Sequence, residues 1–158
     1  MCEPRLSFAC DSPEATHAAA RRLAAQLAPG DAVLLSGNVG AGKTHFARGA
    51  ILSLLDPPED VPSPTFTLVQ TYDGRTGSIW HADLYRLTDI SELEELGLDL
   101  AFQDAISFVE WPDRLGPLTP PDALFVDISA PSADDTRILS LSWSAPKWAD
   151  RLEAFQDG

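Results

Sequence analysis

The sequence predicts an α/β fold in which helices cover a mixed sheet that carries added antiparallel strands. Two observations support this class. Strand-like and helix-like segments alternate in the first half of the chain, as in parallel strands joined by helices, and strand-like runs dominate later. The chain has 158 residues, 44% of them hydrophobic. This is the size of one domain with a buried core, so we expect a single domain over residues 1–158.

The individual elements follow from apolar periodicity and from residues that begin or end helices. Ser12 followed by Pro13 is a typical helix start, because serine caps the helix and proline fits its first turn. The apolar run at 32–35 is typical of a strand buried on both faces. The segment 73–77 lies between two strand-like runs and predicts a hairpin turn. In chain order we expect a strand at 6–10, a helix at 15–27, a strand at 31–36, a helix at 44–55, hairpin strands at 66–72 and 78–83, a helical or turn-like segment at 90–100, strands at 105–109, 124–128 and 136–142, and a short helix with Trp148, Leu152 and Phe155 on one face.

The charge of the chain argues against direct binding to polyanions. There are 11 Lys and Arg against 24 Asp and Glu, which gives a formal net charge of −13. Residues 80–158 carry most of the excess, with 16 acidic and 5 basic side chains. Broad binding to nucleic acid or to anionic lipid needs many Lys and Arg contacts, so we expect neither. The acidic excess is either a solvated face or a docking surface for a basic partner.

The sequence also bears on the compartment. No stretch approaches the roughly 20 apolar residues of a membrane span, and the first residues do not form a basic region followed by an apolar one. Cys2 and Cys10 form no CxxC pair, no disulfide framework and no four-ligand zinc set. We therefore expect a protein of the reducing cytoplasm, with no membrane partner.

A phosphate-binding loop is the strongest signal in the chain. Residues 37–44 match G-x-x-x-x-G-K-[ST] in full, between a predicted buried strand and a predicted helix. The glycines let backbone N–H groups point inward at an anion, and the helix N-terminus adds positive charge there. Lys43 is expected to reach the β- and γ-phosphates, and the Thr44 hydroxyl to ligate Mg²⁺. The candidate nucleotide contacts in this motif are Gly37, Asn38, Val39, Gly40, Ala41, Gly42, Lys43 and Thr44. The motif makes the predicted fold a P-loop NTPase three-layer sandwich that binds a nucleotide with Mg²⁺.

A P-loop enzyme needs a further carboxylate near its metal, usually at the end of a neighbouring apolar strand. Glu110 follows the apolar run 106–109, and Asp83 follows 79–82. Each can hold Mg²⁺ directly or through water, and Asp83 can instead orient the attacking water. The alternative for each is a solvated carboxylate at a strand end. The P-loop earlier in the chain favours the catalytic interpretation.

Several other side chains are weaker candidates. His17, His45 and His81 are too few for a histidine metal site, so a structural hydrogen bond is the better interpretation for His81. His45 lies either near phosphate or on the helix surface. Trp111 either stacks on a base or partner or packs in the core. Arg137 is a candidate contact to the nucleotide, and the sequence leaves the residues that touch the base open.

Four motifs together resemble one family. They are Gly-Ala-Gly-Lys-Thr at 40–44, Ser-Pro-Thr-Phe at 63–66, His-Ala-Asp-Leu-Tyr-Arg-Leu at 81–87 and Glu-Trp-Pro at 110–112. In order and spacing, across residues 30–140, they resemble the TsaE (YjeE) family. The resemblance implies a cytoplasmic, Mg²⁺-dependent ATPase that supports formation of N6-threonylcarbamoyladenosine at position 37 of tRNAs reading codons that begin with A. It also implies two partner proteins, TsaB and TsaD, with tRNA contacted only indirectly.

The resemblance carries roles over to particular residues. It implies that Lys43 contacts phosphates in catalysis and that Thr44 and Glu110 serve Mg²⁺. It further implies that Asp83 supports hydrolysis from a position near the metal. It also implies that Thr65 lies on a switch-like loop that contacts the nucleotide. One residue departs from the pattern. The family often has a second threonine where this chain has His45, so a hydroxyl contact to the α-phosphate is in doubt.

Three alternatives are distinguishable. A Ras-like GTPase is disfavoured because Asn38 is the only asparagine, which leaves no N-K-x-D motif for guanine, although 113–116 matches D-x-x-G. A small-molecule P-loop kinase needs an arginine-bearing lid, and Arg86 is the only basic residue between Gly77 and Trp111. The third alternative is a protein-binding module in which ATP orders the loop at 61–65 for a partner without appreciable hydrolysis.

Overall fold

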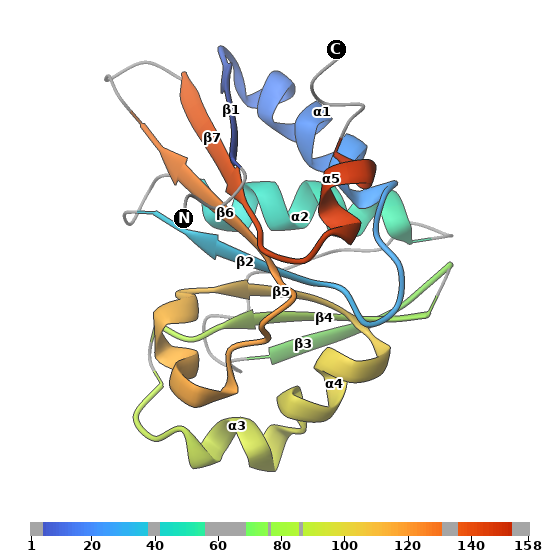
Figure 1. Ribbon diagram of the computed structural model, residues 1–158, viewed down its shortest axis with the longest axis vertical. Coiled ribbons are helices and arrows are strands. Elements are labelled where there is room, and N and C mark those ends of the chain that lie inside the picture. The colour runs from blue at the N-terminus through green and yellow to red at the C-terminus, as the bar shows by residue number, and fades with distance from the viewer. Residues whose placement is uncertain are drawn as a thin grey trace.

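The computed structural model describes residues 5–37, 42–55, 69–75, 77–85, 87–130 and 136–152. Its strands form one seven-stranded sheet in the order β1-β7-β6-β2-β5-β4-β3 (Figure 1). The strands are β1 (Arg5–Cys10), β2 (Ala32–Ser36), β3 (Val69–Gly74), β4 (Gly77–Asp83), β5 (Ile106–Glu110), β6 (Leu124–Ser129) and β7 (Arg137–Ser142). The helices are α1 (Pro13–Ala24), α2 (Lys43–Leu54), α3 (Ser91–Leu96), α4 (Leu98–Asp104), the 3-10 helix η1 (Pro112–Leu118) and α5 (Lys147–Arg151).

The sheet is mixed, as the sequence predicted. Strands β4, β5, β2 and β6 run parallel to one another and form its centre. Antiparallel strands extend both sides, with β3 beside β4 and with β7 and β1 beyond β6. The central strand β2 is buried along 32–35, because a parallel strand covered by helices on both faces has no side in water.

Helices cover both faces of the sheet and complete a three-layer sandwich (Figure 1). Helices α1, α2 and α5 pack on one face, where Phe46, Phe108 and Trp148 belong to the same apolar cluster. Helices α3, α4 and η1 pack on the other, around Leu93 and Leu115. The predicted P-loop NTPase sandwich with added antiparallel strands is therefore confirmed.

Some boundaries differ from the prediction. Helix α1 starts as expected, with the Ser12 side chain accepting from the Ala15 N–H at 3.0 Å, but it ends at Ala24, before the predicted Leu27. The hairpin is tighter than predicted, since the ladder between β3 and β4 extends to the pair Gly74 and Gly77. Cross-strand pairing thus takes in residues that the sequence assigned to the turn.

The segment after β4 also differs. The predicted helical stretch at 90–100 is two short helices, because Gly97 adopts φ +85° and its left-handed backbone ends α3 before α4 begins. The 3-10 helix η1 was not predicted. It begins directly after Trp111, whose φ of 59° is in the left-handed region.

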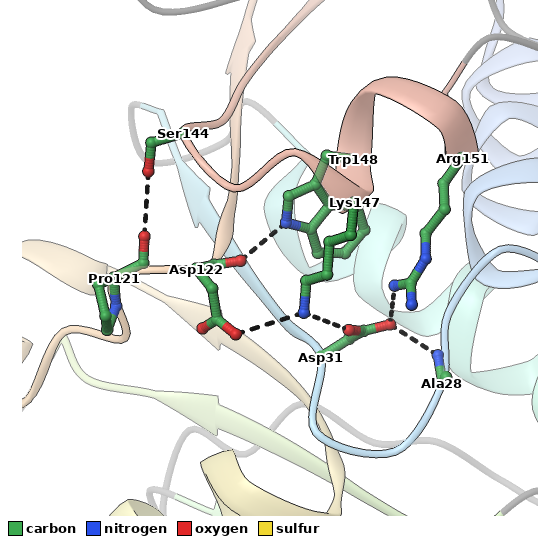
Figure 2. Close-up of polar contacts among 8 residues, drawn as sticks. All are labelled: Ala28, Asp31, Pro121, Asp122, Ser144, Lys147, Trp148 and Arg151. Atoms are coloured by element: carbon green, nitrogen blue, oxygen red, sulfur yellow. Dashed lines mark hydrogen bonds and ion pairs between the residues drawn. The ribbon is translucent and has the colours of Figure 1, made fainter.

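A buried carboxylate fixes the C-terminal helix to the sheet (Figure 2). Asp31 precedes β2, and its side chain is only 3% exposed. It accepts the Ala28 N–H at 2.7 Å and pairs with Lys147 at 2.8 Å and with Arg151, both from α5. The charge of the carboxylate is thus compensated from two sides, as a buried charge requires.

Apolar packing completes this attachment. Trp148 is fully buried, and its Nε1–H donates to the Asp122 carbonyl at 2.7 Å (Figure 2). Leu152 is buried in the same cluster, which confirms two of the three residues predicted for this apolar face. The third, Phe155, lies outside the described residues.

Two further observations concern membrane-spanning helices and the cysteines. None of the helices in the described part of the chain is long and apolar enough to cross a membrane. Cys10 is a free, buried thiol whose pKa is raised by burial. Cys2 lies outside the described residues.

Candidate nucleotide site

The phosphate-loop motif lies between the end of β2 and the start of α2, as predicted. Gly37 and Gly42 have φ values of +143° and +107°, a backbone region that favours glycine. Gly42 is also the N-cap of α2, where its carbonyl accepts the Phe46 N–H at 2.9 Å. The motif residues 38–41 lie outside the described part of the chain.

Lys43 lies within the protein at this junction. It is 5% exposed, and its Nζ donates to the Gly37 carbonyl at 2.6 Å. The same ammonium lies 4.1 Å from the centroid of the Trp111 ring, a cation–π contact. Burial lowers the pKa of Lys43, while the carboxylates of Glu110 and Asp83 act in the opposite direction. These contacts hold the Lys43 ammonium close to Gly37, at the start of the loop, while the Lys43 backbone lies just after its end.

Glu110 connects three elements at the site. It is 2% exposed. Its Oε1 accepts the Thr44 hydroxyl at 2.7 Å, and its Oε2 lies 2.7 Å from Nε2 of His81. The hydrogen bond predicted for His81 is therefore present. The two predicted oxygen donors, the Thr44 hydroxyl and the Glu110 carboxylate, are in direct contact.

Strand register explains why these side chains meet. Glu110 pairs with Leu35 of β2 on one side and with Asp83 of β4 on the other. Paired residues of neighbouring strands point to the same face of a sheet, and so do residues two apart on one strand. His81, Asp83 and Glu110 therefore share the face that α2 covers, and Thr44 in the first turn of α2 meets them there.

Asp83 has a different environment from Glu110. Its side chain is partly exposed, and Oδ1 accepts the Tyr85 N–H at 3.1 Å. Burial raises the pKa of Asp83, the Tyr85 hydrogen bond opposes this, and the nearby Glu110 charge raises the pKa further. Of the two predicted carboxylates, Glu110 touches Thr44, while Asp83 lies beside it with one face toward solvent.

Trp111 lies at the edge of the site. It is partly buried, and its ring is 5.0 Å from the ring of Tyr85, in addition to its contact with Lys43. The left-handed backbone at Trp111 turns the chain directly after β5. The sequence left stacking and core packing open for this residue. The structure places the indole between the margin of the core and the Lys43 ammonium.

Three further nucleotide contacts were predicted from the sequence: His45, Arg137 and Thr65. The His45 ring faces α1, with Nε2 3.2 Å from the Pro13 carbonyl and its centroid 5.5 Å from that of His17. Arg137 is at the start of β7, and a Cβ added at Gly42 would lie 3.9 Å from its Nε, so this guanidinium is beside the start of α2. Thr65 lies outside the described residues.

The sequence analysis missed Asp127. It lies on β6 opposite Ser36, and its Oδ1 accepts the Ser36 hydroxyl at 3.1 Å. Burial lowers the pKa of Lys43, and the charge of Asp127 opposes this shift, as those of Glu110 and Asp83 do. The rule that selected Asp83 and Glu110, an acid near the end of a parallel strand, identifies this residue when it is applied to the predicted strand at 124–128.

The chemistry of the donor set matches magnesium with a nucleotide. Mg²⁺ prefers oxygen ligands and is usually held by one or two protein groups, with phosphate and water completing its shell. Thr44 and Glu110 supply such oxygens beside a buried lysine. Among the described residues no group of three or more His, Cys, Asp or Glu is arranged to hold a metal.

Comparison with known proteins identifies the family. The family described as "Threonylcarbamoyl adenosine biosynthesis protein TsaE" matches residues 10–139. The chain belongs to the TsaE family. It is 40% identical over 131 residues to the tRNA threonylcarbamoyladenosine biosynthesis protein TsaE of Mycobacterium tuberculosis, a match covering 77% of each chain. It is 39% identical over 120 residues to the protein of the same name from Rickettsia conorii, covering 76% of this chain and 69% of that one.

A solved structure agrees with this TsaE assignment at the level of the fold. The crystal structure of Bacillus subtilis YdiB matches with a TM-score of 0.79 and 26% identity, covering 100% of this chain and 99% of that one. The overall fold is thus shared over almost the full length of both chains.

Proposed function

We propose that this TsaE-family chain is a Mg²⁺-dependent ATPase of tRNA threonylcarbamoyladenosine biosynthesis, acting in the cytoplasm with TsaB and TsaD partner proteins. The contact between Thr44 and Glu110 at 2.7 Å, directly after the phosphate-loop lysine, carries the proposal. It brings a hydroxyl and a carboxylate together at the N-terminus of α2, where backbone N–H groups and the helix dipole favour phosphate.

The roles of the residues follow from their environment. Lys43 contacts the Gly37 carbonyl and the Trp111 ring, and its ammonium can form a stronger, charge-assisted contact with a phosphate group. Thr44 and Glu110 would hold Mg²⁺, which neutralises charge on the phosphate oxygens. Asp83 is partly exposed beside Glu110 and orients water at the open side of the site. Arg137, beside Gly42, supplies a further positive group for the nucleotide.

The partners follow from the charge and from the family. A formal net charge of −13 opposes direct binding to tRNA, so the chain reaches its substrate through other proteins. The TsaB and TsaD proteins are the partners that we propose. Nucleotide binding and hydrolysis then regulate that assembly, while the transfer chemistry takes place on a partner.

Titration of the purified chain with ATP and GTP, with and without Mg²⁺, tests this function. We expect Mg²⁺ to strengthen ATP binding, and phosphate release to rise when TsaB and TsaD are added. Phosphate transfer to a small acceptor would support a kinase instead, and binding without turnover in any mixture would support a nucleotide-gated module.

A matched pair of variants locates the activity. Lys43→Ala removes the buried ammonium and should reduce ATP affinity at least about 100-fold, because charge-assisted contacts to phosphate are among the strongest hydrogen bonds. Arg48→Ala removes the same charge from the next turn of α2. Arg48 is partly exposed and is not one of the proposed nucleotide contacts, so this variant should leave affinity within about threefold. Equal losses in the two variants would contradict the proposed site.

A further inference from the structure

His81 is a buried polar residue in an otherwise apolar part of the sheet. It is 0% exposed, and it pairs with Phe108 of β5 and lies two residues from Ile79, which are both fully buried. Its Nε2 contacts Oε2 of Glu110. Its Nδ1 is buried without a hydrogen-bond partner among the residues that the structure describes.

This arrangement does not serve the fold in the simplest way. A carboxylate only accepts hydrogen bonds, so Nε2 of His81 carries the proton and donates it to Glu110. The other ring nitrogen, Nδ1, is then a buried polar atom without a described hydrogen-bond partner, which is unfavourable. An apolar side chain would fill the same space without that cost. The use of a histidine here therefore points to its effect on Glu110.

The effect is orientation of the Glu110 carboxylate. The last torsion of a glutamate side chain is broad, so a carboxylate held at one oxygen only is poorly fixed. His81 holds Oε2, and Oε1 is thereby directed at the Thr44 hydroxyl.

We infer that His81 is a positioning residue: it fixes the Glu110 carboxylate with one oxygen toward Thr44. The inference rests on the proposed function, because its consequence is a preformed pair of oxygens for Mg²⁺. His81 acts on that pair through Glu110.

Two variants of similar size and polarity separate positioning from simple structural packing. His81→Gln places an amide N–H near the position of Nε2, so it can still donate to Glu110. His81→Asn places its amide near the position of Nδ1, and it is too short to reach. Both leave a polar side chain in the same core position, so a packing defect should affect both alike. Thermal unfolding without ligand measures that shared defect.

The decisive measurement is affinity for a non-hydrolysable ATP analogue, by calorimetry, with and without Mg²⁺. In His81→Asn we expect the gain in affinity from Mg²⁺ to fall about tenfold, the size of one charge-assisted hydrogen bond. Mg²⁺-free affinity should stay within about threefold, and His81→Gln should keep the wild-type gain within about threefold.

The outcomes separate this inference from the proposed function. A wild-type chain that binds no nucleotide overturns the proposed function itself. Suppose instead that the wild-type chain binds ATP more tightly with Mg²⁺. If His81→Gln and His81→Asn then lose this gain in affinity equally, or both keep it, the positioning role of His81 is overturned and the proposed function stands.

Discussion

Replacing Glu110 by glutamine and by alanine separates its structural contribution from its proposed role at the metal. Both variants remove the buried negative charge, so the cost of desolvating that charge is absent from both. They differ in shape. Glutamine can accept the His81 N–H and donate to the Thr44 oxygen, whereas alanine does neither and leaves a cavity.

The difference in stability follows from these contacts. In Glu110→Ala the Nε2–H of His81, which is fully buried, loses its acceptor, at about 1–3 kcal/mol. The lost side-chain packing adds about 1–2 kcal/mol. Thr44 is partly exposed and can bond to water instead. We therefore expect Glu110→Ala to be less stable than Glu110→Gln by about 2–5 kcal/mol, or roughly 4–20 °C in melting temperature.

The hydrolysis assay should give a different pattern. Both variants lack the carboxylate charge proposed for Mg²⁺, so both should lose Mg²⁺-dependent turnover by on the order of 100-fold or more. ATP affinity without Mg²⁺ should change little, since Lys43 keeps its contacts. Equal melting temperatures for the two variants would refute the hydrogen-bonded shell around Glu110. Near-normal turnover in Glu110→Gln would refute the role of its charge.

Three further predictions concern other described contacts. The raised pKa of Asp83 means that the folded chain holds this proton more tightly than the unfolded chain, so ionised Asp83 weakens the fold at neutral pH. Asp83→Asn should therefore raise the melting temperature at pH 7 while slowing hydrolysis. This gain in melting temperature should disappear as the pH falls through the pKa of Asp83 in the folded chain toward its pKa in the unfolded chain. A gain in melting temperature that grows in acid would contradict this. Asp31→Asn should lower the free energy of unfolding, measured by chemical denaturation, by about 1–3 kcal/mol, because it weakens the attachment of α5. The Asp122 carboxylate is 54% exposed and 3.4 Å from Lys147, so Asp122→Asn should lower it by less than about 0.5 kcal/mol. Gly49→Ala should destabilise the folded chain by about 1–3 kcal/mol, because its Cβ would lie 2.1 Å from the His17 ring. If this contact is the cause, adding His17→Ala should recover most of the lost stability.

The features predictable from the sequence were those set by local pattern. The continuous apolar run at 32–35 predicted the central strand, and Ser12 with Pro13 predicted the start of α1, because burial on both faces and helix capping depend on neighbouring residues. The phosphate-loop motif predicted the junction between β2 and α2. The two carboxylates were found by a rule about the ends of parallel strands; in the structure Glu110 contacts Thr44, and Asp83 lies beside Glu110 on the neighbouring strand.

The remaining features depend on residues far apart in the chain. The contact of His81 with Glu110 spans 29 positions, and that of Lys147 with Asp31 spans 116. Neither separation leaves a periodic signal. The left-handed backbone at Trp111 is equally hidden, since a tryptophan has no local preference for it. Asp127 was missed for a different reason: the rule was applied to two strands and not to the third.

The two buried acids show why tertiary contacts decide what a carboxylate does. Asp31 and Glu110 are both 2% exposed, and both lie at the ends of central strands, Asp31 before β2 and Glu110 at the end of β5. Asp31 is paired with two cations, so its charge is compensated within the protein and attaches α5 to the sheet. Glu110 is instead hydrogen-bonded to the uncharged Thr44 hydroxyl and to the His81 ring. This difference in partners separates Asp31, which attaches α5 to the sheet, from Glu110, which we propose as a metal ligand.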